Sequence, residues 1–171
     1  MTLSFEQIYN EYIDDIHRYI YLHVHNTQIA EDLTQDTFIK VYRSLDTYRS
    51  TGSIKAWIFQ IAKHTTYDYY RKNKWGSIFA TPLNESHVYR NSFENELERD
   101  AEIHTLYTAM KQLKKDYQEV LILRKINEFS IKETAEILNW SENKVKKKLE
   151  RALIKLQQTI QLEEGILYVK R

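Results

Sequence analysis

Apolar residues recur at steps of three and four along most of this 171-residue chain, which is the period of an α-helix. The first block carries three such stripes, at 5–23, 30–45 (with Tyr42 among its apolar members) and 54–65. Further stripes follow at 103–113, 117–126 and 129–156. Thr27 and Ser53 can cap the second and third helices. Three Gly and one Pro are too few for a turn-rich β fold, so the sequence predicts an all-α protein.

The charge is unevenly distributed along the chain. Residues 1–75 hold nine basic and nine acidic side chains, residues 76–102 hold two and six, and residues 103–171 hold fourteen and nine. The segment 76–100 has no sustained period and contains the only Pro. We therefore expect two small helical domains, 1–75 and 101–171. An acidic, flexible linker at 76–100, with a short helix at its end, would join them.

Several kinds of protein and site are not expected. The chain has no Cys, and so no disulfide framework or thiolate metal site. The N-terminus has no basic segment followed by an apolar one, so it does not predict a signal peptide, and no apolar run reaches 18 residues. His23 and His25 would point apart on a helix, so no metal is expected. Without a Ser-His-Asp order, a Gly-rich phosphate loop or an HExxH motif, we predict no enzyme, cofactor or small-molecule substrate.

The stretch "SIKETAEILNWSENKVKKKLERA" (130–152) predicts a helix-turn-helix. Ser130 can cap a short helix, Asn139 tolerates the left-handed conformation of a tight turn, and Ser141 can cap the following helix. The small Ala135 lets the two helices approach closely. The second helix has an inner apolar stripe at Val145, Leu149, Ala152 and Leu156.

This second helix carries more positive charge than a solvated face needs, because like charges close together repel. A recognition helix requires long cations that reach the phosphates and base edges of the DNA major groove. The sequence therefore predicts DNA contacts from Ser141, Lys144, Lys146, Lys147, Lys148 and Arg151. The alternative is an ordinary solvated basic helix.

The first block holds a second cluster, in which aromatic and basic residues alternate. Unpaired bases stack on aromatic side chains while cations follow the backbone, so this cluster is typical of single-strand binding. The predicted residues are Tyr48, Arg49, Lys55, Trp57, Lys63, His64, Tyr67, Arg71 and Lys72. Two alternatives stay open: Trp57 lies on the apolar stripe and can be a core residue, and the rest can form an exposed tyrosine-rich surface.

Three stretches together resemble bacterial sigma factors of the extracytoplasmic-function class. They are "AEDLTQDTFIKVYRSLDTYR" (30–49), "IKAWIFQIAKHTTYDYYRK" (54–72) and "LKKDYQEVLILRKINEFSIKETAEILNWSENKVKKKLERALIKL" (113–156), which are similar to regions 2 and 4 of that class in order and spacing. The resemblance implies that loop 48–53 and helix 54–72 open and read the −10 promoter element. The linker would pass through the polymerase cleft and RNA exit path. Region 4 would read the −35 element and contact the β flap.

The resemblance also implies a partner for the second helix, the β′ clamp helices of core RNA polymerase. The matching residues are Asp32, Gln35, Asp36, Phe38, Ile39, Lys40 and Arg43. The expected partners are core RNA polymerase, promoter DNA and an anti-sigma factor, and the expected location is cytoplasmic. His64 stands where many members have Asn, so the −10 base preference does not transfer. Lys114 replaces a frequent Pro, and Asn139 and Asn143 replace frequent Gly residues.

The rival hypothesis is a free-standing helix-turn-helix repressor or activator that binds operators as a dimer. Residues 30–72 distinguish the two. A repressor would need an effector pocket or a dimer face there, whereas a sigma factor needs a polymerase-binding helix and strand-separating aromatic residues. A third hypothesis, a structural or adaptor protein, leaves the lysines of 144–148 unexplained.

Overall fold

The computed structural model describes residues 4–49, 52–76 and 100–169. All regular elements in these ranges are helices, as the sequence predicts. Chain contacts separate two units, Met1–Tyr89 and Arg90–Arg171. The expected linker 76–100, with its short helix, lies almost entirely outside the described residues, and the domain boundaries 1–75, 76–100 and 101–171 stay a prediction.

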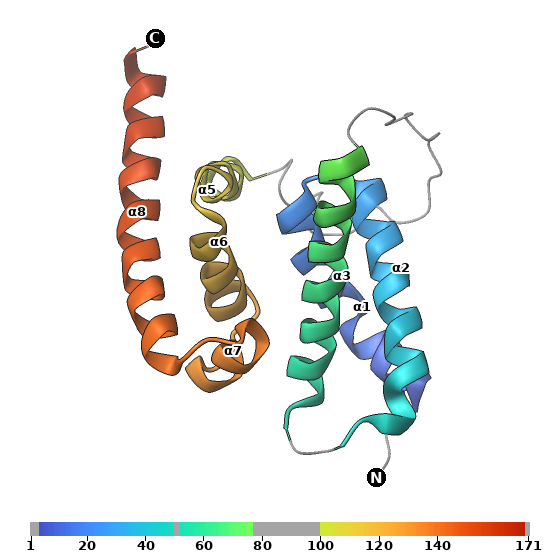
Figure 1. The fold of residues 1–171 in the computed structure, drawn as a ribbon. Helices are drawn as coiled ribbons and strands as arrows, with labels where there is room; N and C mark the ends of the chain where they lie inside the picture. Colours follow the sequence, from blue (N-terminus) through green and yellow to red (C-terminus); the bar gives the residue numbers. More distant parts are fainter. Residues whose placement is uncertain (1–3, 50–51, 77–99, 170–171) are drawn as a thin grey trace. The chain divides into compact units, whose positions relative to one another are not determined.

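The described residues of the first unit form three helices and one short turn. They are α1 (Phe5–Val24), α2 (Thr27–Ser44), the 3₁₀ turn η1 (Leu45–Thr47) and α3 (Ile54–Gly76). Each of the three helices packs on the other two, and Figure 1 shows them side by side. The largest fully buried side chains of this unit are Tyr19, Phe59, Ile8, Ile16, Ile20, Ile58 and Val41.

The predicted cap of α2 is wrong by one residue. Asn26 has extended backbone and its Oδ1 accepts from the N–H of Ile29 at 2.9 Å, so Thr27 is already helical. Asn is at least as good an N-cap as Thr, and His25 before it adopts the left-handed conformation (φ 52°) that ends α1. Ser53 does cap α3, since its Oγ accepts from the N–H of Ala56 at 3.3 Å.

The buried face of α3 is wider than its predicted stripe. Phe59, Lys63 and Thr66 are buried in addition to Ile58, Ala62 and Thr65. The reason is that α3 contacts both α1 and α2, so two adjacent rows of side chains are covered.

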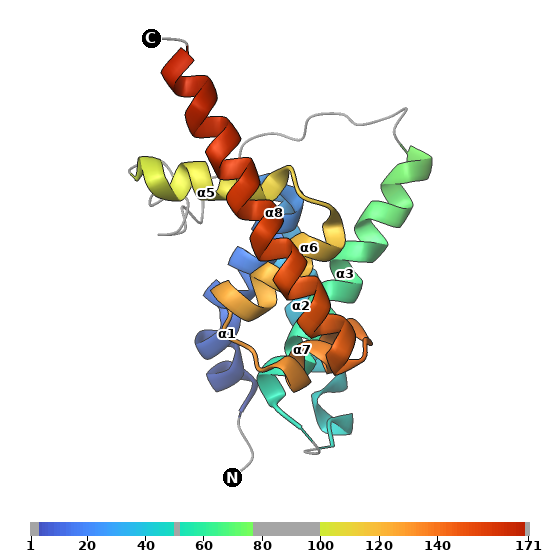
Figure 2. The same cartoon turned by 90° about the vertical axis from the view of Figure 1, so that its left-hand side faces the viewer.

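The remaining helices that the structure describes lie in the second unit. They are α5 (Ala101–Lys111), α6 (Lys115–Leu121), the π-helical segment η2 (Ile122–Ile126), α7 (Ile131–Leu138) and α8 (Glu142–Val169). The long helix α8 packs on α5, α6 and α7, and Figure 2 shows it crossing them. Val145, Ala152 and Leu156 of its predicted inner stripe are buried, and Leu149 is half-buried.

The predicted helix over 117–126 is an α-helix only as far as Leu121. From Ile122 the backbone widens to π-helical, and both the backbone N–H and the side-chain Nδ2 of Asn127 donate to the Ile122 carbonyl at 3.0 Å. Glu128 then adopts φ 58°, a conformation that most side chains disfavour, and the chain turns into α7. None of the helices in the described ranges is long and apolar enough to span a bilayer.

Candidate nucleic-acid interface

The predicted helix-turn-helix is present, with both helix caps and the left-handed turn residue. Ser130 and Glu133 form a capping box at the start of α7, with bonds of 2.9 and 3.1 Å. Asn139 adopts the left-handed conformation (φ 54°, ψ 47°), and the N–H of Trp140 donates to the Ala135 carbonyl at 2.9 Å. The Ser141 Oγ accepts from the N–H of Lys144 at 3.2 Å and caps α8.

Five of the six predicted DNA contacts on α8 are exposed. They are Ser141, Lys144, Lys146, Lys147 and Arg151, whereas Lys148 is half-buried. Residues three and four positions apart share a helix face, so Lys144, Lys147 and Arg151 form one row. We name these three residues the cation row. Lys146 is two positions from Lys144 and lies on another face of the helix.

Two of these lysines are held by neighbouring side chains. The Nζ of Lys148 lies 2.7 Å from the Asp116 carboxylate of α6 and 5.4 Å from the centroid of the Tyr117 ring. The Nζ of Lys144 lies 4.0 Å from the centroid of the Trp140 ring. Lys147 and Arg151 have no ring or acidic partner among the residues that the structure describes.

The aromatic residues predicted in the first unit have different surroundings. The rings of Tyr48 and Trp57 pack at a tilt of 37° with centroids 4.7 Å apart, and the Tyr48 hydroxyl donates to the Gly52 carbonyl at 2.8 Å. Trp57 is half-buried, so part of its surface packs in the fold and part is accessible. Tyr67 is 44% exposed and offers the most accessible ring of the set.

The cations of this cluster are only partly available. Arg49, His64, Arg71 and Lys72 are exposed, whereas Lys63 is 7% exposed, so little of its side chain is accessible to DNA in this conformation. Its Nζ lies 5.9 Å from the centroid of the Tyr67 ring. The guanidinium of Arg71 pairs with Asp68 at 3.0 Å.

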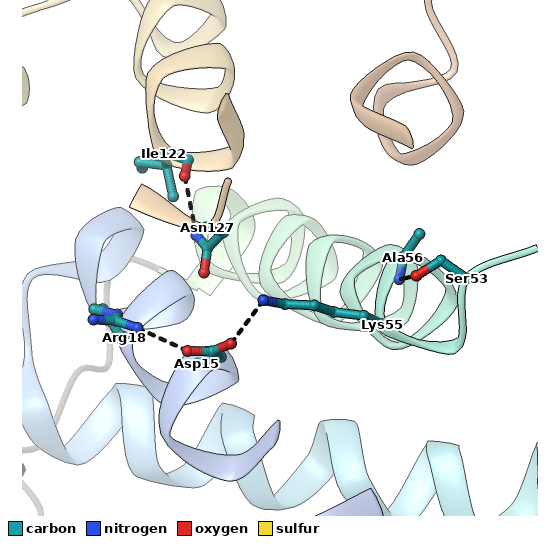
Figure 3. A network of polar contacts seen from close by, with 7 residues as sticks. All are labelled: Asp15, Arg18, Ser53, Lys55, Ala56, Ile122 and Asn127. Carbon is teal, nitrogen blue, oxygen red and sulfur yellow. Dashed lines mark hydrogen bonds and ion pairs between the residues drawn. The ribbon is translucent and has the colours of Figure 1, made fainter. Parts of the chain in front are cut away.

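Lys55 forms an ion pair with Asp15, which was not among the predicted site residues. Its Nζ pairs with Asp15 of α1 at 3.0 Å, and the other Asp15 oxygen accepts from Arg18 at 2.7 Å (Figure 3). The pair joins residues 40 positions apart, so only the packing of α1 against α3 reveals it.

Most of the predicted polymerase-binding residues lie on the surface of α2. Asp32, Gln35, Asp36, Ile39, Lys40 and Arg43 are exposed. The exception is Phe38, which is 3% exposed and packs its ring on Tyr9 at 4.9 Å, so its side chain belongs to the core and not to this surface. Lys40 also donates to the Thr65 hydroxyl at 3.0 Å.

Tyr42 corrects the predicted stripe of α2. The sequence placed it on the apolar face, but its side chain is 65% exposed, with one edge of the ring against Phe5. Together with Ile39, which is 48% exposed, it gives the outer surface of α2 an apolar part beside the charged one.

Among the described residues, clear pKa shifts occur in the first unit. Burial raises the pKa of Tyr12 to about 12, with a smaller contribution from a hydrogen bond to Glu11. Burial also raises the pKa of Tyr70, whose hydroxyl donates to the His23 carbonyl, and lowers the pKa of His17. The described residues contain no group of three or more His, Cys, Asp or Glu that could hold a metal ion.

Comparison with known proteins gives two family matches in this chain. Residues 8–76 match the model of Sigma-70 region 2, and residues 103–156 match that of Sigma-70 region 4. The Bacillus subtilis RNA polymerase sigma factor YlaC is 35% identical over 92% of each chain. The B. subtilis ECF RNA polymerase sigma factor SigX is 32% identical over 95% of this chain and 86% of its own.

Two solved structures share the fold. One is the sigma factor RpoE of Bartonella quintana in complex with the anti-sigma factor NepR, with a TM-score of 0.73, 22% identity and coverage of 92% of this chain and 96% of that one. The other is CnrH in complex with the cytosolic domain of CnrY, with a TM-score of 0.66, 22% identity and coverage of 92% and 88%.

Proposed function

Since this chain belongs to the sigma-70 family of RNA polymerase sigma factors, in the extracytoplasmic-function class, we propose that its two helical units divide the work of promoter recognition. The chain is a sigma factor that binds core RNA polymerase and directs promoter-specific transcription initiation. Its relatives are sigma factors, which are not enzymes, and we propose that the chemistry of initiation belongs entirely to the polymerase.

The second unit reads the −35 element through α8. The observation that carries this proposal is the capped helix-turn-helix, which presents the three long cations of the cation row on one exposed face. A helix of this kind enters the major groove, where Arg and Lys contact phosphates and the acceptor edge of guanine. The β flap of the polymerase is the proposed protein partner of this unit.

The first unit opens and reads the −10 element. Tyr67 supplies an exposed ring on which an unpaired base stacks, and Arg49, His64, Arg71 and Lys72 supply exposed polar and basic groups around the loop and α3. The accessible part of the Trp57 ring also contacts the −10 element. Lys55 can contact this element only after its ion pair with Asp15 breaks.

The exposed face of α2 binds the β′ clamp helices of the polymerase. Its accessible Asp32, Gln35, Asp36, Lys40 and Arg43 surround the apolar Ile39. Protein interfaces commonly combine an apolar centre with a polar rim, and this face has that composition. Tyr42, which the sequence analysis did not include, joins the proposed set because of its exposure.

The chain acts in the cytoplasm, where the polymerase is, and an anti-sigma factor regulates it. The similar sigma factor RpoE of Bartonella quintana forms a complex with the anti-sigma factor NepR, which supports the proposal for this chain. The acidic segment 76–100 is proposed to run through the polymerase cleft, where its charge resembles that of nucleic acid.

The test of the proposed function is run-off transcription. Purified core polymerase is incubated with this protein and genomic fragments, and transcripts are expected only when both proteins are present. A gel shift separates the rival hypothesis. Tight, sequence-specific duplex binding by the isolated chain, together with no transcripts, would establish a free-standing repressor or activator instead.

A further inference from the structure

Trp140 lies in the turn of the helix-turn-helix, and its ring contacts Lys144, the first basic residue of α8. Its backbone is fixed by the left-handed Asn139 before it and by the bond from its own N–H to the Ala135 carbonyl at 2.9 Å. Its side chain is half-exposed, and the Nζ of Lys144 lies over its ring, 4.0 Å from the centroid. This separation is well within the range in which an indole face attracts an ammonium group.

We propose that Trp140 is a positioning residue for promoter recognition, whose indole face holds the ammonium of Lys144 at the start of the recognition helix. The proposal rests on the proposed function, in which α8 reads duplex DNA. It adds a determinant of affinity that carries no charge and need not touch the DNA itself.

The chemistry of the contact favours this role. An indole ring orients an ammonium without neutralising it, and the exposed Lys144 keeps its charge and its free N–H donors for a phosphate or a base edge. A free lysine side chain loses much rotamer freedom when it binds, and a side chain that is already ordered loses less. Lys148 shows the opposite arrangement, because the Asp116 carboxylate at 2.7 Å offsets its charge.

A purely structural role of Trp140 predicts a different effect of its replacement on DNA affinity. If the indole served only to pack the turn, its replacement would weaken DNA binding equally whether or not Lys144 is present. The cation row contains the matched control, because Lys147 is also exposed on the same face and has no ring beside it among the described residues. A double-mutant cycle therefore separates the two roles.

The experiment uses the holoenzyme and a promoter fragment found by run-off transcription. Closed-complex affinity is measured at low temperature over a series of salt concentrations. Trp140→Leu is expected to weaken binding about two- to fivefold, the size of an exposed cation–π contact, and to leave the salt slope unchanged since no charge is lost. Lys144→Gln is expected to lower the slope by about 1. Trp140→Phe keeps a ring and should retain part of the affinity.

The double-mutant cycle distinguishes a positioning role of Trp140 from a structural one. In the Lys144→Gln background either Trp140 variant should have no further effect, whereas in the Lys147→Gln background each should have its full effect. Thermal melting and competition for core polymerase control for folding, and the Phe variant carries the cycle if the Leu variant does not fold. A full effect without Lys144, or unchanged affinity in both Trp140 variants, would overturn the inference. Unchanged affinity in Lys144→Gln and Lys147→Gln would also overturn it, while the run-off assay reports on sigma activity separately.

Discussion

Asp116→Asn should strengthen DNA binding by the holoenzyme, because it releases Lys148. The ammonium of Lys148 lies 2.7 Å from the Asp116 carboxylate, and the two side chains are 28% and 50% exposed. A pair this accessible contributes about 0–1 kcal/mol to stability, so the melting temperature should change little. Once released, Lys148 lies next to the cation row and can reach a phosphate. One more phosphate contact steepens the salt dependence by about 0.9 in log affinity per log salt, which is an extra loss of about 3.5-fold between 50 and 200 mM.

Fluorescence anisotropy of a labelled promoter fragment, titrated with holoenzyme at several salt concentrations, measures the DNA affinity and its salt dependence. Glu150→Gln is the matched control. Glu150→Gln also removes one negative charge, from α8 and not from α6. Glu150 has no ion-pair partner among the described residues, so this variant frees no lysine. The slope should change in Asp116→Asn alone, and adding Lys148→Gln should abolish the change. Equal slopes in Asp116→Asn and Glu150→Gln would show that Lys148 does not exchange its carboxylate for a phosphate.

Three further outcomes are expected from the same structure. Replacing the exposed Asp32 and Gln35 together with Ala should weaken core binding in a competition assay by at least ~2 kcal/mol, with the circular dichroism spectrum unchanged; undiminished affinity would remove the polymerase contact from α2. A pre-melted promoter bubble should rescue transcription by Tyr67→Ala but not by Lys147→Ala, and equal rescue of both would contradict the proposed division of labour. Asn139→Ala should lower the free energy of unfolding by about 1–2 kcal/mol because of its left-handed backbone, whereas Asn139→Gly should be close to neutral; equal losses in both would mean that the turn does not require this conformation.

Features that depend on a few neighbouring residues could be predicted from the sequence. The cap at Ser130, the left-handed turn at Asn139 and the cap at Ser141 each depend on contacts within four residues, and the structure confirms all three. The cap of α2 was misplaced because Asn26 and Thr27 are both good caps, and a one-residue choice between them has no periodic signal.

Features that depend on which helices meet could not be predicted. Lys63 was assigned to DNA because it lies in an aromatic and basic stretch, but α3 is covered by two helices and its buried face includes that position. Tyr42 was assigned to the core by its spacing, but its side chain is 65% exposed and its ring contacts Phe5. Periodicity gives the direction of a face and not its width, and the width depends on the number of packing partners.

Carboxylates that pair with predicted DNA-contacting lysines lower the affinity of the isolated chain for duplex DNA. In each unit one predicted lysine is held by a carboxylate: Lys55 by Asp15 at 3.0 Å, and Lys148 by Asp116 at 2.7 Å. Either lysine must leave its acid before it contacts a phosphate, which lowers the net gain from that contact. Non-specific affinity for duplex DNA grows with the number of phosphates neutralised, so the pairing of these two lysines with carboxylates reduces it. The isolated chain is therefore expected to bind duplex DNA weakly, and a promoter is bound tightly only when core polymerase supplies the remaining contacts.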